Sequence, residues 1–184
     1  MSFMTAVALL LVLVVVAPAG ARTLAGVEFP DTVDVDGTTL RLNGMGLRQA
    51  TALRIKAYVG GLYLKEPSSD PTVVIDSRQP KRVTMHFLRD IDRKNLTSGW
   101  AASLREVGGT AMEPAIAQFT ALVPDVKRGD AMSFTWRPGA GLEVATGGAA
   151  RGTIAGDDFA RTLFTVWFGP KPGDENLKRG MLGK

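Results

Sequence analysis

The chain has 184 residues, 45% of them hydrophobic and 22% charged, which suffices for one packed core under a hydrated surface. It contains no cysteine and one histidine, so disulfide bridges, a thiol nucleophile, a zinc–thiolate site and a site of several histidines are excluded. We expect no metal and no cofactor. The net charge is +4, but the basic residues are scattered and no aromatic residues interleave with them, so we expect no nucleic-acid partner.

Residues 1–21 have the composition of a secretory signal peptide. They contain no charged side chain, and an aliphatic stretch from Ala6 to Ala17 precedes Pro18 and the small residues Ala19-Gly20-Ala21. We predict cleavage after residue 21, which leaves a single domain of residues 22–184 that is periplasmic or secreted and has no stable membrane insertion. The alternative is a retained anchor, although Pro18 cuts the apolar stretch short of the roughly 20 residues that a span needs. The lack of cysteine in an exported chain favours a bacterial periplasm.

The first half of the domain, from about residue 25, is predicted as strands. Val33 to Leu42 has the composition of a hairpin around an Asp36-Gly37 turn. Gly44-Met45-Gly46-Leu47 is predicted as a turn, and the alternating residues from Leu53 to Val59 predict a longer strand.

Two further features concern the strands that follow. After Gly60-Gly61 the apolar positions of the longer strand change parity, which predicts a bulge at the glycines. Val83 to Leu88 alternates as another half-buried strand, and its His86 has no base or metal partner in view. We therefore interpret His86 as a structural residue on the second face of the sheet.

In the middle of the chain the apolar period changes to that of helices. Asp92 is a predicted N-cap for a helix with Leu96, Trp100, Leu104 and Val107 on one face, ended by Gly108-Gly109. This order predicts an α+β domain with a largely antiparallel sheet and helices packed on one face. The elements predicted after that helix are a helix over Pro114 to Leu122, strands over Ala131 to Arg137, Leu142 to Thr146 and Arg151 to Ile154, a helix capped by Asp157 or Asp158 and stopped at Gly169-Pro170, and a short helix that starts at Asp174.

Familiar catalytic motifs are missing. The sequence contains no G-x-S-x-G elbow, no Walker loop, no G-x-G-x-x-G after a predicted strand and no metal-spaced histidines. The candidate site is instead a cation beside a phenol, Arg48 and Tyr58. A guanidinium can bind a carboxylate through two parallel hydrogen bonds, and a tyrosine hydroxyl can add a third.

Two interpretations of these residues are open. If Arg48 and Tyr58 converge under the helices, they bind an anionic head while an apolar tail lies between helices and sheet. Alternatively, Arg48 caps carbonyl groups of the turn and Tyr58 lies over the sheet edge. Trp100 is a candidate wall of such a pocket, and its apolar stripe also fits plain core packing.

Four motifs occur in order along the chain: LNGMGLR at 42–48, IKAYVGGLYL at 55–64, VTMHFLRD at 83–90 and LFTVWFGPKP at 163–172. In these motifs the chain resembles the bacterial branch of the chalcone isomerase-like family, over nearly all of residues 26–183. The resemblance implies an open-faced β-sandwich, a large, mainly antiparallel sheet covered by helices with a ligand cleft between the layers.

The resemblance also implies roles for single residues. Arg48 matches the arginine that holds and polarises the substrate in the plant enzymes of the family. Tyr58 stands where those enzymes carry a threonine, and Lys94 and Ala101 fall near the positions of their tyrosine and asparagine. Neither Lys94 nor Ala101 supplies the same hydrogen bonds, so we do not expect chalcone cyclisation.

Non-catalytic members of the family bind fatty acids, and their matching arginine grips the carboxylate. We therefore expect an exported protein that binds a fatty acid or similar apolar carboxylate through Arg48, Tyr58 and Trp100, with a guanidinium sheltered by helices and free to receive the anion. One alternative is an isomerase or intramolecular lyase for an enone-like substrate, in which Arg48 is the polariser and sole catalytic candidate. Another is an envelope assembly or structural factor with a vestigial cleft.

Overall fold

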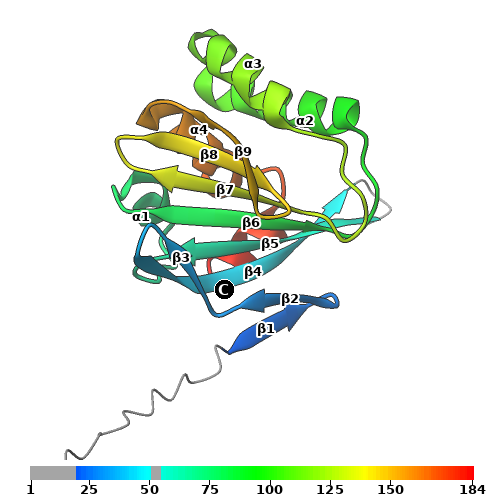
Figure 1. The fold of residues 1–184 in the computed structure, drawn as a ribbon, viewed down its shortest axis with the longest axis vertical. Helices are drawn as coiled ribbons and strands as arrows, with labels where there is room; N and C mark the ends of the chain where they lie inside the picture. Colours follow the sequence, from blue (N-terminus) through cyan, green and yellow to red (C-terminus); the bar gives the residue numbers. More distant parts are fainter. Residues whose placement is uncertain (1–19, 51–54) are drawn as a thin grey trace, which may run out of the picture.

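A seven-stranded antiparallel sheet is the centre of the molecule (Figure 1). The computed structural model describes residues 20–50 and 55–184, so the predicted leader up to residue 19, and Leu53 and Arg54 of the predicted strand, lie outside the described residues. The sheet strands pair in chain order. They are β3 (Thr32–Val35), β4 (Thr38–Ala50), β5 (Ile55–Leu64), β6 (Lys81–Phe87), β7 (Ala131–Arg137), β8 (Gly141–Thr146) and β9 (Ala149–Ile154).

Two short strands ahead of the sheet, β1 (Ala21–Leu24) and β2 (Val27–Pro30), form a separate hairpin. The helices are α1 (Pro71–Asp76), α2 (Arg93–Gly108), α3 (Glu113–Leu122), α4 (Asp157–Phe168) and α5 (Glu175–Met181), with a 3₁₀ turn, η1 (Thr110–Met112), ahead of α3. In the described part of the chain, none of the helices has the length and apolar character needed to cross a membrane.

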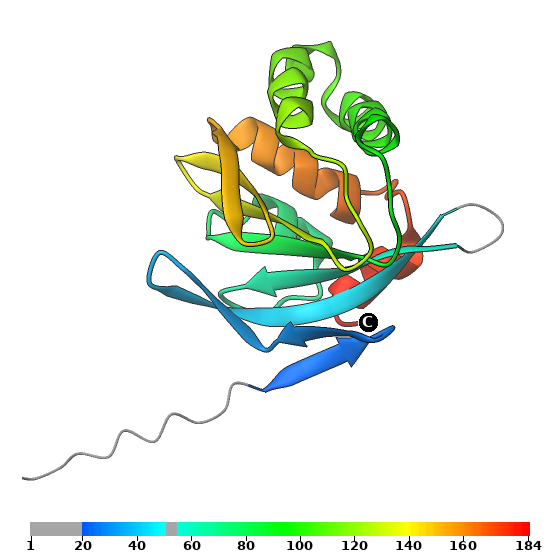
Figure 2. The same cartoon turned by 45° about the vertical axis from the view of Figure 1, so that its right-hand side comes forward.

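The sheet carries a hydrophobic core on each face. The larger core contains residues of all five helices and of strands β5 to β9, so the helices pack on one face, as predicted. Within this layer α4 lies against β7 and β8, and α2 packs on α4 (Figure 2). The smaller core lies on the other face, where Phe29 of the β1–β2 hairpin packs with Leu40, Val59 and Tyr63.

The predicted hairpin between β3 and β4 is confirmed. Asp36 and Gly37 both have positive φ, 51° and 77°, as a two-residue turn of this kind requires. His86 also lies where predicted, on the second face, with its ring centroid 4.8 Å from that of Phe29. Burial lowers the pKa of His86, which agrees with a structural role.

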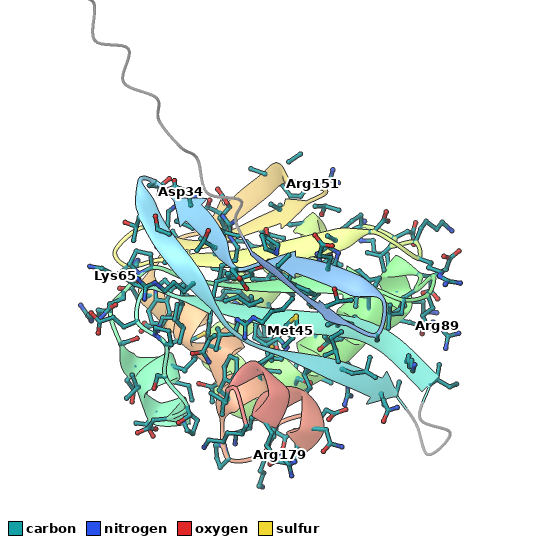
Figure 3. The ribbon with its side chains drawn as sticks, turned by 90° about the horizontal axis from the view of Figure 1, so that it is seen from below. Asp34, Met45, Lys65, Arg89, Arg151 and Arg179 are labelled. Carbon is teal, nitrogen blue, oxygen red and sulfur yellow. The ribbon has the colours of Figure 1, made fainter. Side chains whose placement is uncertain are left out.

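The predicted turn over residues 44–47 is wrong, because β4 runs straight through it to Ala50. The two glycines serve close packing instead of a turn. A Cβ atom on Gly44 would collide with the backbone of Gly180, and one on Gly46 would collide with the backbone of Leu177. The missing side chains therefore let α5 lie directly on β4, as Figure 3 shows for the segments that carry Met45 and Arg179.

The predicted bulge at Gly60-Gly61 is also wrong. These glycines pair regularly with Gly46 and Met45, and the register shifts fall at Asn43 and at the step from Arg48 to Gln49. The change of apolar parity has another cause, because β5 is buried on both faces: Val59 and Tyr63 belong to the smaller core and Leu62 to the larger one.

The predicted helices are present with small differences. Asp92 caps α2 by accepting a hydrogen bond from Asn95 N (2.8 Å), and α2 ends at Gly108, followed by Gly109 with φ 67°. Val107 was expected on the buried face, but it lies in the last turn of α2 and is 39% exposed. Asp157 does not cap α4, because its carboxylate accepts hydrogen bonds from Trp136 Nε1 and Gly139 N instead.

Lys81 at the start of β6 is a fully buried cation. Its Nζ donates to the carbonyl oxygens of Val74 (2.6 Å) and Ser77 (2.7 Å), and lies 4.3 Å from the ring centroid of Trp136. It thereby caps the last turn of α1, which carries no basic residue of its own. Burial lowers the pKa of Lys81 to about 8.

This pKa predicts a pH dependence of stability. Between pH 8 and 10.5 the unfolded chain retains the lysine proton that the folded chain releases, so the contribution of Lys81 to the free energy of unfolding rises with pH. In urea titrations, we expect the free energy of unfolding of the wild-type protein, relative to that of the Lys81→Met variant, to rise by about 2 kcal/mol between pH 7.5 and 9.5. A difference that stays constant over this range would show that the buried amine keeps its ordinary pKa.

Candidate functional site

A pocket of about 380 Å³ lies between the sheet and the helices. Its walls come from β4, β5 and β6 on one side, from α2 and α4 on the other, and from the start of α5. The three residues predicted for the site, Arg48, Tyr58 and Trp100, all line it. The remaining lining residues are Ala50, Met85, Ile91, Asn95, Leu96, Gly99, Ser103, Val166, Trp167, Pro172, Gly173, Asp174 and Leu177.

Sheet register brings Arg48 and Tyr58 together. The two residues are direct partners on neighbouring strands, just before the register shift that follows Arg48. Tyr58 points to the helix-covered face, where it packs against the larger core. The antiparallel pairing of β4 with β5 explains why these two residues meet.

The Arg48 guanidinium is sheltered but not free. Its side chain is 31% exposed, Nη1 donates to the carbonyl oxygen of Gly173, and the same nitrogen lies 3.3 Å from Oδ2 of Asp174. The expectation of an unpaired cation is thus wrong, because the loop before α5 supplies a carboxylate. Among the described residues, the acceptors that contact this guanidinium, the Gly173 carbonyl oxygen and Asp174 Oδ2, both lie at Nη1.

Asp174 is held by several donors at once. Its Oδ1 accepts a hydrogen bond from Leu177 N (3.0 Å), which makes it the predicted N-cap of α5, and its Oδ2 accepts one from Gln49 N (3.2 Å). Burial, the largest effect, raises the pKa of Asp174, but these hydrogen bonds and the Arg48 charge together lower it. The carboxylate is therefore ionised at neutral pH, and the pair with Arg48 carries no net charge.

Tyr58 contributes a phenol that stays protonated. Burial raises its pKa, and this outweighs the opposing effects of a hydrogen bond from the Trp167 side chain and of the Arg48 charge. Its ring also packs edge-on against Phe87, with centroids 6.0 Å apart. Tyr58 thus presents a hydroxyl group at the polar end of the pocket over the whole neutral pH range.

Two tryptophans form an aromatic wall. The rings of Trp100 from α2 and Trp167 from α4 meet edge to face, with centroids 5.1 Å apart and planes at 84°. Trp100 also packs against Phe119 and Phe134, so both interpretations of this residue hold: it belongs to the core and it lines the pocket. These two rings give the pocket an aromatic wall, whose Trp167 side chain also hydrogen-bonds to Tyr58.

A sequence profile of proteins described as chalcone isomerase-like matches residues 21–183. The chain belongs to the chalcone isomerase-like family. No curated protein sequence matches it. Among solved structures, the crystal structure of a fatty-acid binding protein of Arabidopsis thaliana is similar, with a TM-score of 0.74 and 18% sequence identity over 89% of this chain and 96% of that one. At this identity the likeness shows the fold, and it confirms the expected α+β architecture.

The pocket of this chalcone isomerase-like protein lacks the other catalytic positions considered above. Lys94 is exposed on α2, Ala101 is buried in the core, and neither lines the pocket. In the described part of the chain, no three His, Asp or Glu side chains lie close enough to hold a metal ion. The arrangement of cation, carboxylate, phenol and apolar wall fits the binding of an amphiphile.

Several pocket residues were not singled out from the sequence. Asp174 was predicted only as a helix cap, and Trp167 only as an apolar residue at helical spacing. Asp174 reaches the pocket through its contact with Arg48, which lies 126 positions earlier in the chain, and no local sequence pattern indicates such a contact. For Trp167 a signal existed, since the indole carries one N–H that needs a partner when it is buried.

Proposed function

We propose that this protein binds a small apolar molecule with a polar head, such as a fatty acid or a similar apolar carboxylate, in the pocket between sheet and helices. The observation that carries the proposal is the division of one pocket into a polar end, at Arg48 and Tyr58, and an aromatic wall, at Trp100 and Trp167. Its volume of about 380 Å³ falls within the range of small-molecule sites.

The polar end suits a carboxylate that approaches from the open side of the guanidinium. The Nε and Nη2 groups of Arg48 present two parallel donors, the geometry that matches two carboxylate oxygens. The neighbouring hydroxyl of Tyr58 adds a further donor. Because Nη1 already holds Asp174 and Gly173, the guanidinium plane is fixed before the ligand arrives, which reduces the entropy lost on binding.

The apolar part of the ligand lies along the remaining walls. Trp100, Trp167, Met85, Leu96 and Val166 offer hydrocarbon and aromatic surface there. Each methylene buried contributes about 0.8 kcal/mol, so a ten-carbon chain contributes roughly 7 kcal/mol before the cost of association is subtracted. The fatty-acid binding protein with the same fold supports this ligand class.

The first test compares decanoate with 1-decanol, two ligands with the same chain length and different heads. We expect Arg48→Met to weaken decanoate binding about 10- to 100-fold, the value of a charge-assisted hydrogen bond, and 1-decanol binding by much less. Native mass spectrometry and titration of tryptophan fluorescence measure the affinities for both ligands. Arg179→Met is the matched control, because it removes the same charge from an exposed position of α5 that does not line the pocket. Equal losses in both variants would contradict a head-group site at Arg48.

The second test fills the pocket from its wall. Gly99 lies inside α2 and lines the pocket, and no atom stands within 4 Å of the place where its Cβ would be. We expect Gly99→Phe to abolish decanoate binding, whereas Gly99→Ala retains it and raises the free energy of unfolding by about 0.5–1 kcal/mol through helix propensity. Unchanged binding in Gly99→Phe, seen in the same fluorescence titration, would place the ligand elsewhere.

We also propose export to the periplasm or the secreted space, on the composition of residues 1–21. The intact mass of protein purified from its native compartment measures this directly. We expect a chain that begins at Arg22. A full-length chain in the membrane fraction would instead favour the retained anchor.

A further inference from the structure

The interaction between Arg48 and Asp174 has a consequence for ligand choice. We infer that Asp174 sets the head-group selectivity of the pocket: it compensates the Arg48 charge, so that carboxylates bind more weakly than the guanidinium alone would allow and uncharged hydroxyl or carbonyl heads compete with them. This inference rests on the proposed function, because it concerns the same pocket. It adds a specificity-determining residue and a second class of ligands.

The carboxylate belongs to the binding site itself. Asp174 lines the pocket together with Arg48, and its Oδ2 lies 3.3 Å from Arg48 Nη1. The side chain of Asp174 is 11% exposed and that of Arg48 is 31% exposed, so water and salt screen the ion pair only in part. A carboxylate bound at the Nε and Nη2 edge of Arg48 therefore meets a negative charge on the opposite edge of the same guanidinium, and like charges at such a distance oppose binding.

Asp174 is not free to move away when a ligand enters. Its Oδ1 caps α5 through Leu177 N, and its Oδ2 accepts a hydrogen bond from Gln49 N in β4. The first turn of α5 also packs directly on β4, because Gly46 has no side chain to keep the backbone of Leu177 away from the strand. A swing of the carboxylate would break two backbone hydrogen bonds at once, so the ion pair is a permanent part of the binding site.

A ligand with an uncharged head group interacts differently with Arg48, Tyr58 and Asp174. A hydroxyl or carbonyl oxygen accepts hydrogen bonds from Arg48 Nε or Nη2 and from the Tyr58 hydroxyl, and it carries no net charge for Asp174 to repel. A neutralised cation still donates hydrogen bonds, but it no longer supplies a net attraction for anions. The site thus distinguishes heads by charge much less than an unpaired arginine would.

The test uses Asp174→Asn in the full protein with decanoate and 1-decanol as probes. Asparagine is as good an N-cap as aspartate, so the hydrogen bond from Leu177 N to Oδ1 is retained while the charge is removed. The Nδ2 group that replaces Oδ2 cannot accept the hydrogen bond from Gln49 N, so that bond is lost. We expect the variant to bind decanoate about tenfold more tightly than the wild type, in line with the effect of one neighbouring charge. We expect its affinity for 1-decanol to stay within about twofold. Isothermal titration calorimetry at pH 7.5 measures all four affinities.

The outcomes separate this inference from the proposed function. If neither probe binds the wild type, the proposed function fails. If both bind and the ratio of their affinities is the same in wild type and variant, the inference alone is overturned. Asp174→Ser, which also caps a helix without a charge, repeats the measurement independently, and circular dichroism melting shows that each variant remains folded. A fall in decanoate affinity in both variants would also overturn the inference.

Discussion

The carboxylate of Asp174 holds together the parts on which the site depends. It caps α5 through Leu177 N, ties that helix to β4 through Gln49 N, and pairs with Arg48 in the lining of the pocket. The hydrogen bonds and the cation stabilise its charge more than burial destabilises it, and its pKa is lowered as a result. The same group therefore fixes α5 against β4 at the edge of the pocket and balances the charge of Arg48 there.

This junction is possible because α5 and β4 approach each other closely. Gly44 and Gly46 have no side chains that would keep the helix away from the strand. The loop before α5 therefore lies beside Arg48, which donates to the carbonyl oxygen of Gly173. Trp100 and Trp167, which also line the pocket, pack edge to face and continue into the main core. The pocket thus lies at the edge of the larger hydrophobic core, and several of its lining residues belong to that core.

Local patterns in the sequence predicted much of this structure. The Asp36-Gly37 turn and the helix that presents Trp100 were predictable because their signals lie within a few residues. The role of Gly46 in β4 was not predictable in this way, since the helix residue that packs on it, Leu177, lies 131 positions further along the chain. For the same reason the sequence singled out Arg48, which lines the pocket, and missed that Asp174 pairs with it.

A crystal structure of the protein with decanoate tests the central claim most directly. The account predicts that a carboxylate oxygen lies within hydrogen-bond distance of Arg48 Nε or Nη2, that the chain runs along Trp100 and Trp167, and that Asp174 keeps its bonds to α5 and β4. A ligand bound outside this pocket, or one whose carboxylate displaces Asp174 from Arg48, would contradict it.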